Sequence, residues 1–526
     1  MAETAKTLST STNEKSQSND ARSSIERLND SKTPELVIAL VGPVGTDINK
    51  ISGMISEQLT SEFGYLCTEI KLSRFISENH KNPIKNPFVK GEESDEFKRI
   101  TDLIIRGNSL RNQYSKSILA DFAVKQIGFE RQKLKEEKVN NRRCYIINSI
   151  KNKAEYEVLK NVYGELLYFL GIFSPHKIRK ENLCSATKKL TSQDAEIIMD
   201  TDAKQDDDWG QNVTETFSKA DFFLRIDSSA TKDIQNKIGR FLNLIFDTEV
   251  ITPTPSETAM YHASSAAGNS ACLSRQVGAA ITDKDGDLIS IGWNDVPKFG
   301  GDLYMSSEDD PTNRNDNRCY NRENHCYNDI YKNQLAESLF QRLVKDGIIK
   351  EENKANASII IRKSFKDLIE FSRAIHAEMH AIITGSQKAG SRMRGGKLFC
   401  TTYPCHNCAR HIIAAGIEEV YYIEPYDKSL GVKLHSDALT EDEDSKDKVK
   451  ILMYDGVSPN RYLSLFKLSI GPRKVKGVGT MVKPDKATAK PKETKSLEAI
   501  ETLESSVTKS LEARLEQIGK TLTLAQ

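Results

Sequence analysis

The chain has 526 residues, with 75 Lys and Arg against 74 Asp and Glu, for a formal net charge of +1. That length suffices for two or three domains with their own hydrophobic cores. The near-neutral charge argues against a broad electrostatic footprint for duplex DNA or long RNA, although a local pocket for a small anion needs no global charge. No apolar run is long enough to span a membrane, no secretory signal is visible, and nine cysteines are scattered. We therefore expect a cytoplasmic protein with no membrane partner and no disulfide framework.

The first half of the chain alternates strand and helix patterns. Residues 1–34 are polar, with few large apolar side chains, and predict a disordered leader. Residues 35–250 predict an α/β domain. Its first strand, "ELVIALVG", runs into a Gly-containing turn and an amphipathic helix, and "RCYIINSI" and "YFLGIF" predict further strands.

The turn after the first strand has the composition of a phosphate-binding loop. It contains Gly42, Gly45, Thr46 and Asp47, but the Lys-Ser/Thr pair that closes a working loop is missing. Without that lysine, the β- and γ-phosphates of a nucleotide lose their main cation. We expect a domain that has lost phosphoryl transfer and keeps these four residues as a weak site for a bound nucleotide.

Residues 255–472 predict a second α/β domain. A helix near 256–275 is followed by a hairpin in "VGAAITDKDGDLISIGWN". Then "HAEMHAI" has a helical pattern, "KLFCTTY" a strand pattern, and "CARHIIAAGIEEVYYIEPY" predicts helix then strand. Between the hairpin and the first of these, an insert at roughly 298–355 is rich in Asn, Asp, Arg and Tyr and is expected to be a long loop, either functional or disordered.

Residues 473–526 predict a Lys- and Pro-rich linker and an amphipathic helix. Apolar residues recur at three- and four-residue spacing from Leu497 to Ile518. Two explanations stay open: the stripe packs back on its own chain, or it joins two helices between subunits. The second explanation underlies our prediction of a homo-oligomer.

Four residues carry the strongest chemical signal. Cys405 and Cys408, at the start of a helix, can bind one metal ion as thiolates, and His376 supplies a third ligand. A catalytic Zn²⁺ keeps its fourth position for water, whose pKa it lowers toward neutrality. Glu378 follows His376 by two residues and is placed to move a proton without being a ligand. Taken alone, His376 could be a core histidine, and Cys405 and Cys408 a structural or redox pair. Together the two halves predict a hydrolytic zinc site.

This pattern, His376-Ala377-Glu378 with Pro404-Cys405-His406-Asn407-Cys408, resembles the H-x-E … P-C-x-x-C signature of zinc-dependent nucleoside and nucleobase deaminases. The flanking "SRQVGAAI" and "GWNDVP" are similar to the deoxycytidylate deaminase family. The resemblance implies that Asn294 contacts the sugar and that Ala377, Thr401 and Thr402 contact the base. Trp293 and Asp295 depart from the family's usual residues beside that asparagine. A turn role for Asn294 and a strand-end role for the two threonines are the alternatives.

In the first half, "LVGPVGTD", "GNSLRNQY" and "SPHKIRKENL" resemble nucleotide kinases. A degenerate P-loop kinase-like α/β domain followed by a cytidine-deaminase-like three-layer α/β/α domain resembles the bacterial anti-phage dCTP deaminases, over about residues 35–470. That resemblance implies deamination of dCTP, dCMP or both as antiviral defence, with a regulatory antitoxin RNA in some members.

Three further possibilities follow from the sequence. Cys319 and Cys326 in the insert could hold a second zinc, with Cys272 or His262 as a further ligand, or could be incidental cysteines of a polar loop. Arg275 could contact a substrate phosphate or form a surface salt bridge. The function could instead be editing of cytosine or adenine in nucleic acid, or that of a zinc-stabilised, nucleotide-sensing scaffold.

Overall fold

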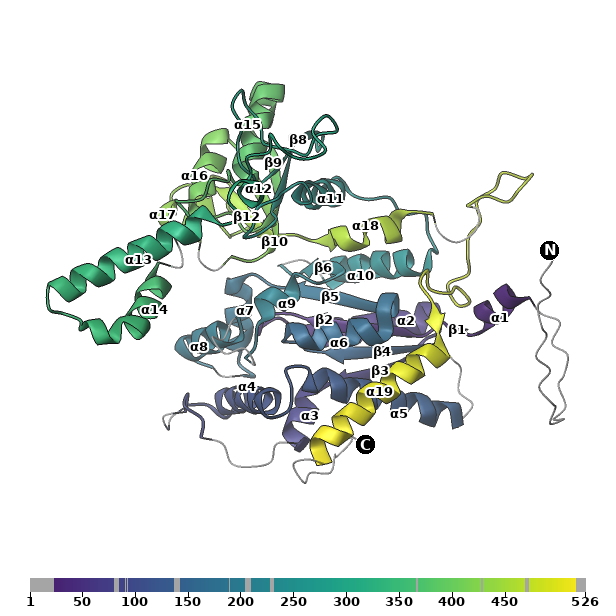
Figure 1. Cartoon of the computed structure of the whole chain (residues 1–526). Helices are drawn as coiled ribbons and strands as arrows, with labels where there is room; N and C mark the ends of the chain where they lie inside the picture. Colours follow the sequence, from purple (N-terminus) through teal and green to yellow (C-terminus); the bar gives the residue numbers. More distant parts are fainter. Residues whose placement is uncertain are drawn as a thin grey trace, which may run out of the picture.

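The computed structural model describes residues 23–79, 85–89, 91, 93–136, 142–188, 190–203, 210–227, 231–365, 368–426, 429–468 and 473–516. These residues form two six-stranded sheets with helices on both faces, stacked one above the other in Figure 1. The first sheet has the strand order β13-β6-β5-β2-β4-β3, and the second has the order β11-β12-β10-β9-β7-β8. The predicted α/β organisation is confirmed for both halves.

The first sheet is built on a central, fully buried strand. Its five parallel strands are β2 (Leu36–Val41), β3 (Leu66–Lys71), β4 (Arg143–Asn148), β5 (Leu167–Phe173) and β6 (Phe222–Arg225). All six residues of β2 are buried because helices cover both faces, which explains its unbroken apolar sequence. Alternate β2 residues pack with α2 (Ile48–Phe63) and α10 (Thr231–Phe246) on one face. The others pack with α5 (Ile118–Glu136) and α6 (Lys153–Tyr163) on the opposite face.

Five further helices belong to this domain. They are α3 (Leu72–Asn79), α4 (Asp95–Gln113), α7 (His176–Leu183), α8 (Ser192–Ala203) and α9 (Val213–Phe217). Helices α4, α7 and α8 share a small apolar cluster of their own, which includes Phe97, Leu183 and Ile198. This cluster holds α7 and α8 beside the predicted phosphate loop.

The second sheet begins with the predicted hairpin, β7 (Gly278–Thr282) and β8 (Leu288–Trp293), which pair antiparallel. It continues through β9 (Lys397–Thr402), β10 (Glu419–Glu424), β12 (Val449–Met453) and β11 (Leu439–Thr440). Helix α11 (Pro255–Ala267) covers one face, while α15 (Ala377–Ala389) and α16 (His406–Ala415) lie on the other.

Two glycines of the hairpin let helices approach the second sheet from opposite sides. A Cβ at Gly278 would lie 1.9 Å from the Ala263 carbonyl oxygen of α11, and one at Gly292 would lie 2.4 Å from the Ala377 carbonyl oxygen of α15. Gly292 pairs with Ala279, the neighbour of Gly278, so the two glycines face opposite sides of the sheet. The order is therefore helix, sheet, helix.

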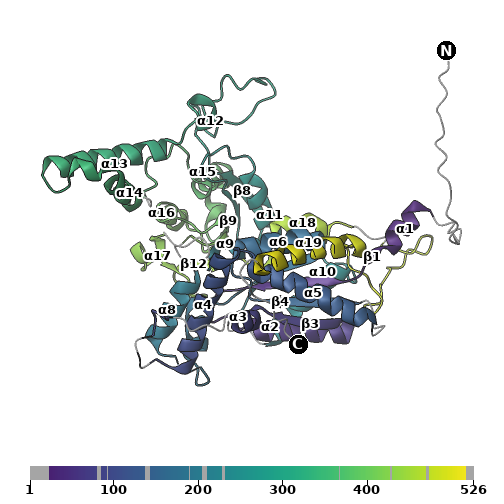
Figure 2. The ribbon, with the colours of Figure 1, turned by 60° about the horizontal axis from the view of Figure 1, so that its bottom comes forward.

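The insert is not the long loop that its composition predicts. It contains α12 (Cys319–Arg322), α13 (Tyr327–Lys345) and α14 (Lys354–Ser364). Helices α13 and α14 pair into an arm that projects from the second domain in Figures 1 and 2. The arm buries little, around Ala336, Phe340 and Ile361, so it shows only a short apolar stripe among polar residues. That weak signal explains the wrong prediction.

The predicted boundary at residue 472 also differs from the structure. After β12 the chain returns to the first sheet, where β13 (Gly456–Val457) pairs antiparallel with β6. Helix α18 (Pro459–Phe466) then packs against α10 and α11. A two-residue edge strand leaves no periodic pattern, so only its tertiary pairing reveals where the chain crosses.

The C-terminal segment completes the first domain. β14 (Lys495–Ser496) pairs with β1 (Lys32–Thr33), and α19 (Leu497–Glu516) packs against α5 and α6. Glu504 of α19 is buried, accepts a hydrogen bond from Tyr163 at 2.9 Å, and pairs with Arg131, which also pairs with Glu35. The apolar stripe therefore packs back on its own chain up to residue 516, and Ile518 lies outside the described residues.

The predicted leader differs from the structure in its last part. Residues 1–22 lie outside the described residues, but α1 (Ser24–Asp30) is a short helix whose Ser23 and Glu26 form a reciprocal cap.

The two domains share one continuous apolar cluster. In it, Val37 and Phe223 of the first sheet pack with Met453, the last residue of β12, and with Tyr454, which follows it. Within the described part of the chain, every helix is too short or too polar to cross a bilayer.

Candidate metal centre and catalytic pocket

Two helix N-termini bring the predicted ligands together. His376 is the N-cap residue of α15, Cys405 is the N-cap residue of α16, and Cys408 lies in the first turn of α16. The His376 Nδ1 atom is 3.3 Å from the Sγ atom of each cysteine, and the three ligand atoms all lie within 4.8 Å of one another. Neither helix has a side-chain cap, so the helix dipoles favour thiolates here.

The Cys405 thiol and the His376 imidazole shift each other's pKa. A hydrogen bond with Cys408 lowers the pKa of Cys405 to about 4, and a hydrogen bond with Cys405 raises the pKa of His376 to about 9. A thiolate is the form of cysteine that binds a metal ion, and the proton on the imidazole would leave when a cation binds in its place. Two sulfur donors and one nitrogen donor with one position left open fit a catalytic zinc. The donor chemistry therefore supports Zn²⁺.

Glu378 lies in the first turn of α15 and is only 4% exposed. Its carboxyl group interacts with the Cys408 thiol, and burial raises its pKa. It lines a cavity of about 190 Å³ together with His376, Ala377 and Cys405. A proton-transfer group and two of the three ligand residues therefore line one cavity.

The other predicted substrate residues divide into two groups. Asn294, Ala377 and Thr402 line the cavity. Thr401 is not among its lining residues, and its hydroxyl accepts a hydrogen bond from the Gly278 backbone N–H at 3.1 Å, so it holds β9 to β7.

Asn294 ties two backbone segments together at the cavity wall. Its Oδ1 accepts from the Val277 backbone N–H at 2.7 Å, and its Nδ2 donates to the Arg275 carbonyl at 2.8 Å. One lone pair and one N–H of this amide stay available for a ligand. The turn role and the substrate role are therefore compatible.

The cavity has walls that sequence reasoning missed. Among them are Asn328 and Ile369 from the insert, and Tyr403 and Tyr426 from the ends of β9 and β10. Tyr403 directly precedes the Pro-Cys of the motif, which is the one signal that could have found it. Arg275 also lines the cavity, and its guanidinium pairs with Glu424 at 3.0 Å.

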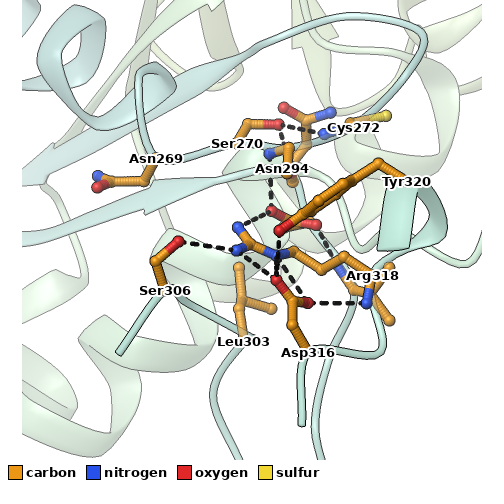
Figure 3. A network of polar contacts seen from close by, with 12 residues as sticks. Asn269, Ser270, Cys272, Asn294, Leu303, Ser306, Asp316, Arg318 and Tyr320 are labelled. Carbon is orange, nitrogen blue, oxygen red and sulfur yellow. Dashed lines mark hydrogen bonds and ion pairs between the residues drawn. The ribbon is translucent and has the colours of Figure 1, made fainter. Parts of the chain in front are cut away.

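A buried ionic network anchors the insert beside the cavity (Figure 3). Arg318 makes three hydrogen bonds through Nε and Nη2 to Asp316, at 2.7–3.0 Å, and its Nη1 lies 3.4 Å from Asp295. All three residues are buried, and Tyr320 donates to Asp316 at 2.8 Å. Asp295 also accepts from the Ala271 backbone N–H at 2.9 Å. The departure at Asp295 thus has a structural reason.

A backbone hydrogen bond links Asp295 to the residue before the ligand His376. Its carbonyl accepts from the Ile375 N–H at 2.9 Å, and Ile375 directly precedes His376. On the other side of Asn294, the Trp293 backbone N–H donates to His380 at 3.2 Å. The His380 ring also packs edge-on against the Trp293 ring. The turn around Asn294 is therefore fixed from both sides.

The predicted phosphate loop has its own internal partners. The Val44 backbone N–H donates to Asp202 at 2.6 Å, and Lys151 bridges Asp202 and the Gly42 carbonyl, at 2.8 Å each. The Asp47 side chain caps α2 by accepting from the Lys50 N–H. A Cβ on Gly45 would lie 2.6 Å from the Arg179 carbonyl, so α7 packs directly on the loop. Thr46 donates its backbone N–H to the Pro43 carbonyl at 3.2 Å.

The cysteines of the insert are not gathered as the metal ligands are. Cys272, Cys319 and Cys326 line one small cavity, but the only described group of three or more ligand atoms within 4.8 Å is His376, Cys405 and Cys408. Cys326 lies 3.5 Å from the Ser274 hydroxyl, and Cys319 lies 3.9 Å from the Arg373 guanidinium. All nine cysteines are described, and none is in a disulfide.

Two cysteines and a histidine around an open position, with a buried glutamate beside them, define a zinc-dependent hydrolytic site. Residues 253–424 match the family described as the cytidine and deoxycytidylate deaminase zinc-binding region. This part of the chain is therefore similar to the zinc-binding region of that family, and zinc is the metal of the site.

Single proteins are also similar to parts of this chain. The chain is 29% identical over 162 residues to a deoxycytidylate deaminase of Enterobacteria phage T2, covering 30% of this chain and 74% of that protein. The crystal structure of dCMP deaminase from cyanophage S-TIM5 in complex with dCMP and dUMP is 20% identical, with a TM-score of 0.23, covering 39% of this chain and 99% of its own.

Dephospho-CoA kinase from Campylobacter jejuni is 14% identical, with a TM-score of 0.20, covering 40% of this chain and 97% of its own. Scores this low define neither fold, so the architecture rests on the strand order and layers described above.

Proposed function

We propose that the second domain hydrolyses the amino group of a deoxycytidine nucleotide, converting dCMP, dCTP or both to the uracil nucleotide and ammonia. One observation carries this proposal: the buried Glu378 lines the same cavity as His376 and Cys405, two of the three clustered ligand residues. When bound, Zn²⁺ would supply a Lewis acid that lowers the pKa of a coordinated water. The residues of this chain would do the rest.

The proposed reaction consumes one water and releases one ammonia. The oxygen of water adds to C4 of cytosine, the C4–N bond breaks, and a C4 carbonyl remains. Glu378 takes the proton from the attacking water, places it on N3, and delivers a second proton to the leaving amine. Its position in the first turn of α15, two residues after a ligand, keeps it beside the reacting atoms without coordinating.

Other cavity residues would hold the nucleotide. Asn294 would contact the sugar through its free lone pair and N–H, and the backbone of Ala377 and the hydroxyl of Thr402 would contact the base. Among the described residues, Arg275 is the only lysine or arginine that lines the cavity, so it is the proposed phosphate contact. Its pairing with Glu424 would loosen when a phosphate arrives.

The finer parts of the function rest on the combination of the two domains. We propose dCTP as a substrate and depletion of the deoxycytidine nucleotide pool during phage infection as the role. Asp202 accepts from the Val44 N–H and Lys151 donates to the Gly42 carbonyl. Because these backbone groups already have partners, we propose a structural rather than a nucleotide-binding role for the loop at Gly42–Asp47. An antitoxin RNA, assembly into a homo-oligomer and a cytoplasmic location stay predictions.

The test is turnover by the purified full-length protein, wild type beside Glu378→Ala. Substrates are dCTP, dCMP, dCDP, CTP and a cytosine-containing single strand, with ammonia and uracil product as readouts. We expect turnover of dCTP or dCMP, and a fall of roughly 10²–10⁴-fold in Glu378→Ala, the usual contribution of a general acid–base. Zinc content should be unchanged.

Each other outcome assigns a different function. Turnover only on the single strand would mean nucleic-acid editing. Silence on every substrate, with zinc bound and with Glu378→Ala indistinguishable in phage protection, would mean a zinc-stabilised scaffold. Wild-type protein without zinc would refute the proposed chemistry altogether.

A further inference from the structure

Tyr403 forms part of the wall of the catalytic cavity and also reaches out of it. It lies between Thr402 and Pro404, two residues before the ligand Cys405, at the end of β9. It lines the cavity together with Thr402 and Tyr426. Its hydroxyl donates a hydrogen bond of 2.9 Å to the carboxylate of Glu441, which comes from a different segment, 38 residues later.

Glu441 belongs to a second, larger cavity. This cavity has a volume of about 540 Å³ and lies between the two domains. The first domain contributes the carboxyl ends of β5 and β6 and the start of α7, including Phe173 and Arg225. The second domain contributes Tyr422, Glu441 and their neighbours from β10, β12 and the segment 440–444. In Figure 1, β10 and β12 lie on the side of the second domain that faces the first.

The segment that carries Glu441 is tied to the first domain. Arg225, the last residue of β6, pairs through Nε with Glu443 at 3.0 Å, and its Nη1 donates to the Met453 carbonyl at 3.2 Å. Its backbone N–H donates to Asp455 at 3.1 Å. Arg225 and Glu443 are partly buried, with 14% and 22% of their side chains exposed, so this ion pair is shielded more than a surface pair.

The ring of Tyr403 is also held from the same side. It packs edge-on against Tyr422, with ring centroids 4.8 Å apart, and Tyr422 lines the cavity between the domains. One wall residue of the catalytic cavity therefore has two contacts, a charged hydrogen bond and an aromatic packing, that both belong to the surface facing the first domain. A hydrogen bond to a carboxylate is directional, so it fixes the ring as well as its hydroxyl.

We propose that Glu441 is a positioning residue for Tyr403, and that the first domain, through Arg225 and Glu443, thereby sets the shape of the substrate cavity. This inference rests on the proposed function for its kinetic consequence, but the coupling itself is a property of the fold. Because Tyr403 touches the cavity wall and not the reacting atoms, its displacement would change substrate binding more than the chemical step.

The experiment uses the full-length protein and five variants: Tyr403→Phe, Glu441→Ala, the double variant of these two, Glu443→Gln, and Asp444→Asn as a matched control. Asp444→Asn removes one negative charge from the same segment without touching Tyr403. The first readout is hydrogen exchange of backbone amides in peptides covering 400–405 and 439–445, which needs no turnover. The second is KM and kcat for whichever deoxycytidine nucleotide is turned over, with zinc content measured for each protein.

We expect faster exchange at 400–405 in Glu441→Ala and Glu443→Gln, and wild-type exchange in Asp444→Asn. We expect KM to rise about fivefold in Glu441→Ala with kcat within twofold of wild type, the loss of one partly exposed hydrogen bond to a carboxylate. The double variant should be no worse than the worse single variant, because both remove the same interaction.

Unchanged exchange at 400–405 in both Glu441→Ala and Glu443→Gln would overturn the inference, as would additive effects in the double variant. An equal effect of Asp444→Asn would overturn it too, because general electrostatics would then be the cause. If the wild type turns over no deoxycytidine nucleotide, the proposed function fails, and the exchange experiment still decides whether the first domain positions Tyr403.

Discussion

Replacing Arg318 by methionine tests whether a buried ionic network holds the insert against the catalytic cavity. Arg318 is 4% exposed, and the two carboxylates that it faces, Asp316 and Asp295, are 7% and 1% exposed. Burial alone would raise the pKa of Asp316, yet the hydrogen bonds and charge of Arg318 lower it. Arg318→Met leaves both carboxylates in place without their cation.

The magnitude follows from that imbalance. Removing one partner of a buried ion pair costs about 3–5 kcal/mol, because the remaining charge stays desolvated. The double variant Asp316→Asn with Arg318→Met leaves only Asp295, whose carboxylate still accepts from the Ala271 and Val296 backbone N–H groups. We therefore expect the double variant to recover most of the loss.

The assay is native-state hydrogen exchange of the full-length protein, because a chain of two domains does not unfold in one step. Peptides covering 303–320 and 371–376 report the opening of the insert and of the segment before His376. We expect the opening free energy in Arg318→Met to fall by about 3 kcal/mol or more, which is more than a hundredfold in the opening equilibrium. A fall of less than about 1 kcal/mol, or a double variant worse than the single, would refute the reasoning.

Three further predictions concern the phosphate loop, the second sheet and the metal. Calorimetry should detect no ATP binding by the wild-type protein and should detect binding by Asp202→Ala. ATP binding by the wild type would contradict the proposal that Asp202 makes the loop structural. Although burial opposes ionisation of Glu419, Lys397 and Lys450 hold its pKa at about 2. Because this pKa is below the ordinary value of 4.5, its stabilisation is complete above about pH 4.5 and lost as the pH falls toward 2. Glu419→Gln should therefore lower the free energy of unfolding by about 1–2 kcal/mol at pH 7, after discounting for solvent screening, and by nothing near pH 2; a difference that persists in acid would contradict this. Elemental analysis should find at least one zinc per wild-type chain and none in Cys405→Ala; zinc retained in the variant would exclude that ligand.

Local chemistry made the metal centre predictable. His376, Cys405 and Cys408 begin helices whose patterns are visible in the sequence, and the residue types have few other joint uses. The strands β2, β4 and β5 were equally predictable, because a strand buried on both faces must be apolar throughout. The hairpin β7–β8 followed from its alternation and its turn.

Tertiary structure decided what the sequence left open or hid. The stripe of α19 fits a subunit contact or a domain contact, and only the buried partners of Glu504 on the first domain distinguish them. The sequence of the loop is the same whether it binds a nucleotide or is held by an internal carboxylate. That carboxylate is Asp202, which accepts from the Val44 N–H and comes from a helix more than 150 residues away, so the loop residues Gly42, Gly45, Thr46 and Asp47 give no sign of it.

The walls of the catalytic cavity show the same division. Glu378 was found because it stands two residues from a ligand, whereas Tyr403 gained its role from a hydrogen bond to Glu441 on a segment that faces the other domain. A sequence determines the residue types and local periods that build helices, strands and a ligand triad. Which distant side chains meet across them depends on packing, because burial and hydrogen bonding reward contacts that carry no trace in local spacing.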